Sequence, residues 1–223
     1  MISRFVFSPL KLRIRHARFQ STGSFLLREP PSSAPRQVPT PLAFVSASGW
    51  DTKSATDLSA VSSMFVENGY TCMEIDLSFP PKDTELRRTS QGLMRHFETE
   101  LASHLRFATM SASPFPPVII SRSAGALITQ TYISSNPATG LVLISPPPAN
   151  TAVDSALLPT PLDEFDYEPR FPVALVDVRE QLKMLAETSR LGRDEGVDKL
   201  AVGTLSVQDI YAKIALWLDD IGV

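Results

Sequence analysis

One short stretch constrains the fold of this chain more than any other. In residues 117–127 the apolar run Val118–Ile120 meets a small-x-Ser-x-Gly turn, Ser121–Gly125, and continues into a helix-like pattern. A serine on a tight strand-to-helix turn is exposed, and the first N–H groups of the helix can hold a developing oxyanion. Ser123 is therefore a candidate nucleophile. A serine in this place can also simply cap the helix, because its hydroxyl satisfies an unpaired N–H.

The histidines argue against ordinary serine catalysis. The chain has three, His16, His96 and His104, and all of them precede Ser123. A nucleophilic serine needs a base within hydrogen-bond reach. His96 and His104 fall on a predicted long helix, where we expect partly exposed or structural side chains. The sequence therefore predicts a turn built for a nucleophile without an obvious base.

Composition indicates one globular domain with a tail. The chain has 223 residues, of which 43% are hydrophobic and 20% are charged, enough for one good core. Cys72 is the only cysteine, so no intrachain disulfide can form, and we expect a buried, inert thiol. No motif indicates a metal or an organic cofactor.

The first residues differ from the rest. Residues 1–24 are rich in Arg and Ser, and no acidic residue occurs before Glu29. This composition predicts a mitochondrial transit peptide and a location in the matrix, although a basic tail that binds an acidic surface is the alternative. The apolar residues are too interrupted for a membrane span. Cleavage after Gln20 would take the formal charge from −3 to −8, which argues against nucleic acid as a partner.

The remainder alternates between two kinds of pattern. Residues 25–40 are rich in Pro and Ser and read as a linker or surface arm, which leaves 41–223 as the domain. Continuous apolar runs alternate with helical periodicity, as in a parallel sheet covered on both faces. We therefore predict a doubly wound α/β fold with a mainly parallel sheet of about six strands. The predicted strands are 42–47, 70–77, 117–120, 141–144, 172–178 and 200–202, and the predicted helices are 56–69, 84–105, 123–134, 179–190 and 207–221.

Several segments, taken in order, resemble the α/β-hydrolase superfamily over roughly residues 41–223. They are 44–50, the strand 73–77 with Asp76 near its end, the turn Ser121–Gly125, the strand 140–146 and the final helix around 214–218. The resemblance implies a hydrolase-like domain with little or no cap. It also implies that Ser123 is the nucleophile, that the N–H groups of Trp50, after Gly49, and of Ala124 form the oxyanion hole, and that Asp177 or Glu180 is the acid.

The chain also departs from that family. Residues Val202–Val207 contain no histidine, where the family places its general base, and Ser48 replaces a histidine common in the third-strand loop. Two functions follow as hypotheses. One is a mitochondrial serine hydrolase of a small ester or thioester with an incomplete triad, and the other is a non-catalytic hydrolase-fold protein that binds a partner or ligand.

Other side chains near the predicted site allow two interpretations each. Arg122 can bind an anionic group or pair with an acid such as Glu180, and Trp50 can line a pocket or cover the sheet edge. Asp177 can orient a base or be a polar residue at a strand end. An acidic patch can be solvated surface or a lid that contacts a partner. The patch consists of Asp163, Glu164, Asp166 and Glu168, interleaved with Phe165 and Tyr167.

Overall fold

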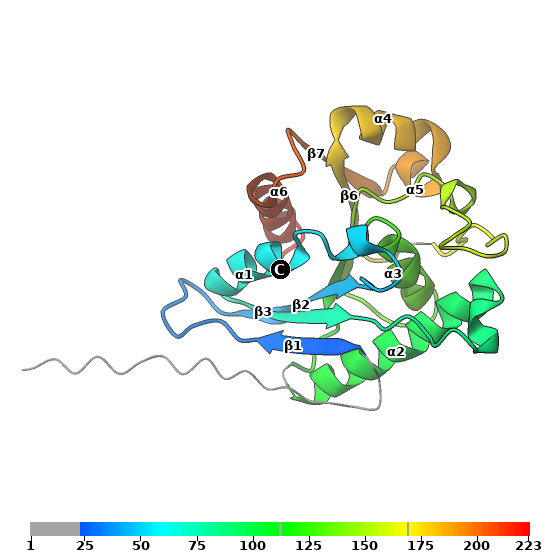
Figure 1. Cartoon of the computed structure of the whole chain (residues 1–223). Helices are drawn as coiled ribbons and strands as arrows, with labels where there is room; N and C mark the ends of the chain where they lie inside the picture. Colours follow the sequence, from blue (N-terminus) through cyan, green and yellow to red (C-terminus); the bar gives the residue numbers. More distant parts are fainter. Residues whose placement is uncertain (1–22, 112, 169) are drawn as a thin grey trace, which may run out of the picture.

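A seven-stranded sheet forms the centre of the protein, with strand order β1-β3-β2-β4-β5-β6-β7 (Figure 1). The computed structural model describes residues 23–111, 113–168 and 170–223, so the predicted leader lies almost wholly outside the described residues. The strands are β1 (Ser24–Arg28), β2 (Val38–Ser46), β3 (Tyr70–Asp76), β4 (Val118–Arg122), β5 (Gly140–Ile144), β6 (Val173–Val178) and β7 (Val197–Val202). All neighbouring pairs are parallel except β1 with β3.

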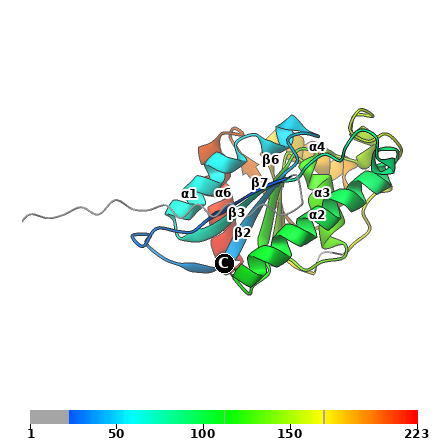
Figure 2. The same cartoon turned by 60° about the horizontal axis from the view of Figure 1, so that its bottom comes forward.

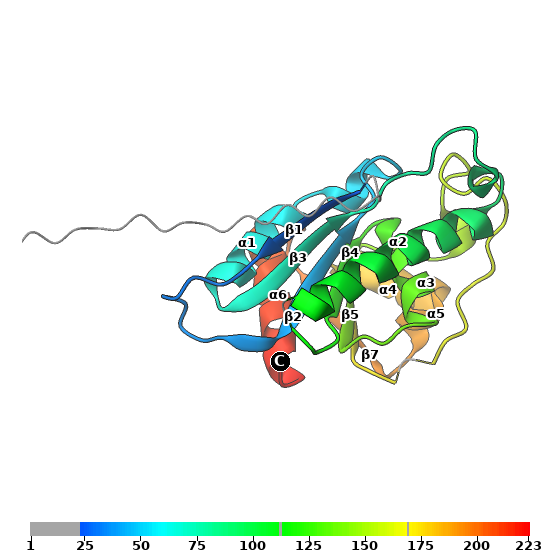
Figure 3. The same cartoon turned by 90° about the horizontal axis from the view of Figure 1, so that it is seen from below.

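Helices cover both faces of this open sheet (Figures 2 and 3). The helices are α1 (Leu58–Glu67), α2 (Ser90–Ser111), α3 (Gly125–Ile133), α4 (Arg179–Thr188), α5 (Arg190–Arg193) and α6 (Val207–Asp220), with short 3-10 turns η1 (Thr52–Ala55), η2 (Glu85–Arg87) and η3 (Asn150–Ala152). The apolar residues of α1 and α6 enter one core, and those of α2 to α5 enter the other. The predicted doubly wound architecture is confirmed.

Strand β5 shows why the strands read as unbroken apolar runs. Successive side chains of a strand point to opposite faces of the sheet. Leu141 and Leu143 pack into the core under α2 and α3, whereas Val142 and Ile144 pack under α1 and α6, and all four are fully buried. Because both faces are covered, neither set of positions can be polar.

Strand β1 is an addition that the sequence pattern does not predict. Ser24, assigned to the leader, and residues 25–28, assigned to the linker, pair antiparallel with β3 at the edge of the sheet. Phe25 is 9% exposed and its ring stacks on His104 at 5.8 Å between centroids. Arg28 pairs with Glu74 at 2.7 Å. The apolar triplet 25–27 is too short to show a period, so only its packing identifies it.

The predicted long helix begins later than its sequence pattern indicates. The predicted helix 84–105 includes Leu86, but this residue lies in η2 and is 38% exposed. The helix α2 starts at Ser90, which is fully buried and whose hydroxyl donates to the carbonyl of Thr160 at 2.5 Å. Among the described residues, no helix is both long and apolar enough to cross a membrane.

Candidate functional site

The loop between β4 and α3 presents Ser123 on a strained turn. Its φ is 54°, in the left-handed region that non-glycine residues rarely adopt, and its N–H donates to the carbonyl of Ile144 at 2.9 Å. Gly125 packs closely, because a Cβ there would lie 3.3 Å from the Cβ of Ser54. Ser123 is half-buried. The sequence therefore produces the strand-turn-helix geometry of a nucleophile elbow.

Asp177 lies at the carboxyl end of β6, as the sequence analysis expects. It is 4% exposed, and its Oδ1 accepts the N–H of Val178 at 2.8 Å. Burial raises the pKa of the Asp177 carboxyl, while the Val178 N–H, the Ser145 hydroxyl and the Arg122 guanidinium oppose the rise. Ionising this buried acid therefore costs free energy, and no imidazole of the described residues is hydrogen-bonded to it.

We expect Asp177→Asn to raise the stability of the protein at neutral pH. A carboxyl whose pKa is raised on folding loses stability as the pH rises above its ordinary value of 3.8. Asparagine removes that cost and keeps an oxygen for the Val178 N–H. Thermal unfolding followed by circular dichroism should show a Tm increase of roughly 2–4 °C, as about 1 kcal/mol gives in a chain of this size.

The gain should shrink as the pH falls through 3.8, because below that pH the wild-type carboxyl becomes protonated in both states. Asp166→Asn, in the exposed acidic patch, is the matched control and should leave Tm unchanged. A lower Tm for Asp177→Asn at neutral pH would mean that the hydrogen bonds of the ionised group outweigh its desolvation.

The loop after β7 uses its polar groups to start a helix. The hydroxyl of Ser206 accepts the N–H of Asp209, and the carboxylate of Asp209 accepts both the N–H and the hydroxyl of Thr204. This reciprocal arrangement is a helix cap. Capping residues therefore occupy the place where the resemblance to the α/β-hydrolases leads us to expect a general base.

The two histidines among the described residues, His96 and His104, both lie on α2. Nε2 of His96 lies 3.1 Å from the carbonyl oxygen of Ser78 and 3.7 Å from Oε1 of Glu100. His104 is 8% exposed, and burial lowers the pKa of its imidazole. Neither imidazole is hydrogen-bonded to Ser123, and the third histidine, His16, lies outside the described residues. Within the described residues, the expectation of structural histidines agrees with these contacts.

A carboxylate that the sequence analysis missed lies against the elbow. Asp51 is 8% exposed; its Oδ2 accepts the N–H of Ala124 at 3.0 Å and its Oδ1 accepts the N–H of Lys53 at 3.0 Å. Asp51 is the N-cap of η1, which is why its side chain turns toward this point. An Asp followed by Thr-Lys-Ser is an N-cap signal, but it does not reveal which distant N–H the second oxygen will reach.

Both predicted oxyanion donors are therefore engaged inside the protein. The N–H of Trp50 donates to the carbonyl of Ala47 at 2.9 Å, and that of Ala124 donates to Asp51. This corrects the expectation that the two groups are free to hold an oxyanion. Two negative charges about 4 Å apart repel by roughly 4 kcal/mol at an effective dielectric of about 20. In the observed conformation, Asp51 thus opposes the charge that ester hydrolysis develops at this point.

The other predicted site residues have structural contacts. Arg122 pairs with Asp57 at 3.1 Å and donates to the carbonyl of Thr56 at 3.1 Å. The expected pairing with an acid is therefore confirmed, but the acid is Asp57 and not Glu180. The ring of Trp50 is 6% exposed, packs on Phe97 at 5.3 Å and donates from Nε1 to the carbonyl of Leu157 at 2.9 Å. A Cβ at Gly49 would meet only an ordinary contact, 3.8 Å from Phe79.

The acidic patch lies on the segment between β5 and β6, where hydrolases insert a cap. Its four carboxylates are exposed and alternate with the half-buried Leu162, Phe165 and Tyr167, which pack on the core. Among the described residues of this segment, the 3-10 turn η3 is the one helical element. The predicted absence of a large cap is consistent with this short, extended covering.

Comparison with solved structures decides the fold. The chain superposes on a cold-adapted esterase from an Arctic intertidal metagenomic library with a TM-score of 0.62 at 13% identity, covering 96% of both chains. The chain has the α/β-hydrolase fold. Two further α/β-hydrolase-fold neighbours are an N-acyl homoserine lactonase (TM-score 0.58, 12% identity, 95% of this chain and 98% of the other) and a predicted CIB-like hydrolase from Thermoplasma acidophilum (0.57, 13%, 94% and 99%). No family model matches the sequence, and no curated protein matches it.

Proposed function

We propose that this α/β-hydrolase-fold protein is non-catalytic at Ser123 and binds a small molecule or a protein partner. The observation that carries the proposal is the contact between the Asp51 carboxylate and the Ala124 N–H at 3.0 Å. That N–H follows the elbow serine, so it is the donor that an ester oxyanion would need. A mitochondrial location, in the matrix, belongs to the proposal because the composition of residues 1–24 predicts it.

Energetics support the same proposal. Loss of a serine-triad member typically costs on the order of 10⁴–10⁶ in turnover, and loss of one oxyanion donor costs a further ~10²–10³. In the described residues both losses coincide, because Ser123 has no imidazole partner and Ala124 donates to Asp51. The remaining rate would be small compared with that of an ordinary esterase.

A serine hydrolase of a small ester or thioester is the second candidate. The observation that favours it is the φ of 54° at Ser123, since a non-glycine residue in the left-handed region costs of order 1–3 kcal/mol. Strain of this kind often persists where it serves chemistry. For this function Asp51 would have to leave the Ala124 N–H, and an unconventional base would have to act.

Labelling with a fluorophosphonate separates the two candidates. We expect the full-length protein and its Ser123→Ala variant to show the same negligible labelling, because an unactivated serine hydroxyl is a weak nucleophile. An active esterase in parallel confirms that the probe works. Labelling of the wild type that disappears in Ser123→Ala would reject the non-catalytic proposal and support the second candidate.

A further inference from the structure

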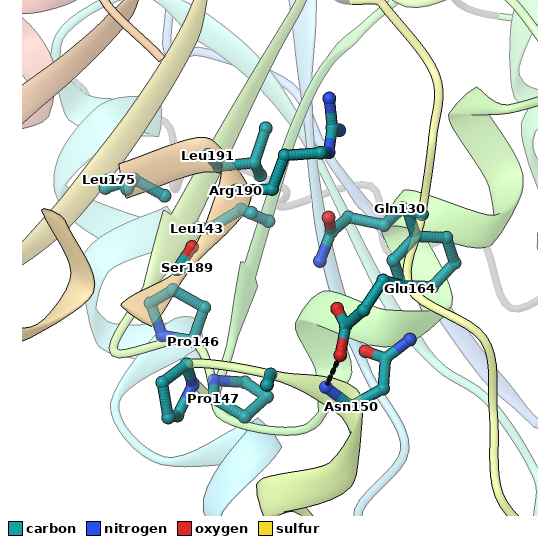
Figure 4. Close-up of a pocket in the computed structure, with 13 residues that line it drawn as sticks. Gln130, Leu143, Pro146, Pro147, Asn150, Glu164, Leu175, Ser189, Arg190 and Leu191 are labelled. Carbon is teal, nitrogen blue, oxygen red and sulfur yellow. Dashed lines mark hydrogen bonds between the residues drawn. The ribbon is translucent and has the colours of Figure 1, made fainter. Parts of the chain in front are cut away.

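Two neighbouring cavities lie beside the acidic patch, and Ser123 and Asp177 do not line either of them. The inner cavity, about 30 Å³, lies over Leu143 of β5 and Leu175 of β6 and is shown in Figure 4. The outer one, about 500 Å³, opens between Thr151 and α5. They share the walls Pro148, Ala149, Glu164 and Arg190, so we treat them together as the Arg190 pocket. Its total size fits a small organic ligand.

The guanidinium of Arg190 has one nitrogen without a hydrogen-bond acceptor among the described residues. Its guanidinium carbon lies 4.8 Å from the centroid of the Tyr167 ring, which fixes the side chain by a cation–π contact. Its Nη2 is buried and has no hydrogen-bond acceptor, and Arg190 forms no ion pair with any described residue. A buried charged donor without an acceptor is costly. Nη2 itself is closed to solvent, so the rest of this side chain lines the cavity, where its positive charge has no carboxylate partner among the described residues.

Neighbouring groups do not supply that acceptor. In Figure 4 the Glu164 carboxylate turns toward Asn150, whose N–H it accepts at 2.5 Å. The hydroxyl of Tyr167 donates to Gln130 at 3.2 Å, and burial raises the pKa of this phenol, so it stays neutral at physiological pH. Both groups have partners of their own, and the Tyr167 hydroxyl also contacts the Arg190 side chain, but neither accepts a hydrogen bond from Nη2.

A second cation lines the outer cavity. Arg193 is exposed, and one of its nitrogens donates to the carbonyl of Thr188 at 3.3 Å, which leaves its other donors for a ligand. Arg190, Arg193 and Glu164 together give the pocket a net charge of one positive unit. A monoanion matches this charge better than a dianion does.

We propose that the Arg190 pocket binds a small organic monocarboxylate, with its acid group on Arg190 and Arg193 and its apolar body against Pro148 and Ala149. Planar guanidinium groups match the two oxygens of a carboxylate. The inference rests on the proposed binding function, because it names the class of ligand and a site away from the elbow.

Titration of the full-length protein with sodium hexanoate tests this. The measurement is the change in amide chemical shifts by ¹H–¹⁵N NMR, with hexanamide as the neutral analogue and hexyl phosphate as the dianion. We expect saturable shifts centred on residues 148–151 and 188–193. Hexanoate should bind about tenfold or more tighter than hexanamide, as expected for hydrogen bonds to a charged donor.

Two variants of Arg190 sharpen the test. Arg190→Met should weaken hexanoate binding by about tenfold or more, and Arg190→Lys should weaken it less, because it keeps the charge without the planar fork. Arg179→Met, an exposed arginine on α4 outside this pocket, is the matched control and should bind hexanoate as the wild type does. Circular dichroism confirms that each variant is folded.

Several results would overturn the inference. They are the absence of saturable shifts, equal affinity for hexanoate and hexanamide, shifts centred on Asp51 and Ala124, or unchanged binding by Arg190→Met. Tighter binding of hexyl phosphate than of hexanoate would reject a monoanion site. Fluorophosphonate labelling at Ser123 reports separately on the proposed function, so the two failures are distinguishable.

Discussion

Asp51→Ala is expected to lower the free energy of unfolding by about 2–3 kcal/mol, because it leaves two backbone N–H groups without their acceptor. These are the buried N–H of Ala124 and the N–H of Lys53 at the start of η1. Denaturant unfolding followed by fluorescence measures the change. The larger part of the penalty falls on the Ala124 N–H, since its hydrogen bond to Asp51 is buried, whereas that of Lys53 is part-buried.

Asp51→Asn is the matched variant for this prediction. Its single side-chain oxygen can keep one of the two hydrogen bonds, so we expect about half of the loss. An Asp51→Ala variant as stable as the wild type would show that the carboxylate does not hold the elbow in place.

The same pair of variants bears on the function. If the protein is non-catalytic, removing the Asp51 charge leaves fluorophosphonate labelling at background, because the hydroxyl still has no base. Labelling that rises in Asp51→Asn and depends on Ser123 would instead identify Asp51 as a group that suppresses a competent nucleophile.

Gly192→Ala is expected to destabilise the protein by about 3 kcal/mol, the upper range for overpacking a closely packed site. A Cβ at this position would lie 2.1 Å from the carbonyl oxygen of Leu185 and 2.3 Å from its carbonyl carbon. Both atoms belong to the backbone of α4, so no side-chain rotation relieves the contact. Thermal and denaturant unfolding measure the loss.

Gly203→Ala is the control for this prediction. Its added Cβ would meet only the Asp209 carboxylate at 3.6 Å, an ordinary contact, so we expect a change within about 0.5 kcal/mol. Because Gly192 lies between Arg190 and Arg193, Gly192→Ala should also weaken hexanoate binding. Equal stability of Gly192→Ala and the wild type would mean that α5 moves away from α4 without cost.

Local patterns account for most of the fold. The apolar runs 141–144 and 172–178 predict buried strands because strands covered on both faces exclude polar residues. The small residues at 121 and 125 predict the tight crossing of strand and helix at Ser123. These features depend on neighbours within a few positions, so they can be recognised without the tertiary structure.

The partners of polar side chains could not be predicted in the same way. The sequence predicts that Arg122 can pair with an acid such as Glu180, but it does not reveal that the acid is Asp57, 65 positions away. Strand β1 has too few apolar residues to be recognised from the sequence. Its Phe25 ring packs on His104 of α2, a contact that only the folded chain makes. Contacts of this kind depend on how elements pack, which periodicity does not encode.

By itself, the sequence determined the alternation of strands and helices, the elbow at Ser123 and the lack of a histidine after it. Each of these depends only on which residues follow one another along the chain. Only the tertiary structure decided what surrounds the elbow and the Arg190 pocket. It brings Asp51 to the N–H of Ala124, 73 positions along the chain, and leaves the Arg190 Nη2 without an acceptor among the described residues. The physical reason is that hydrogen bonds and charges act through space, so the chemistry of both places depends on distances that folding sets.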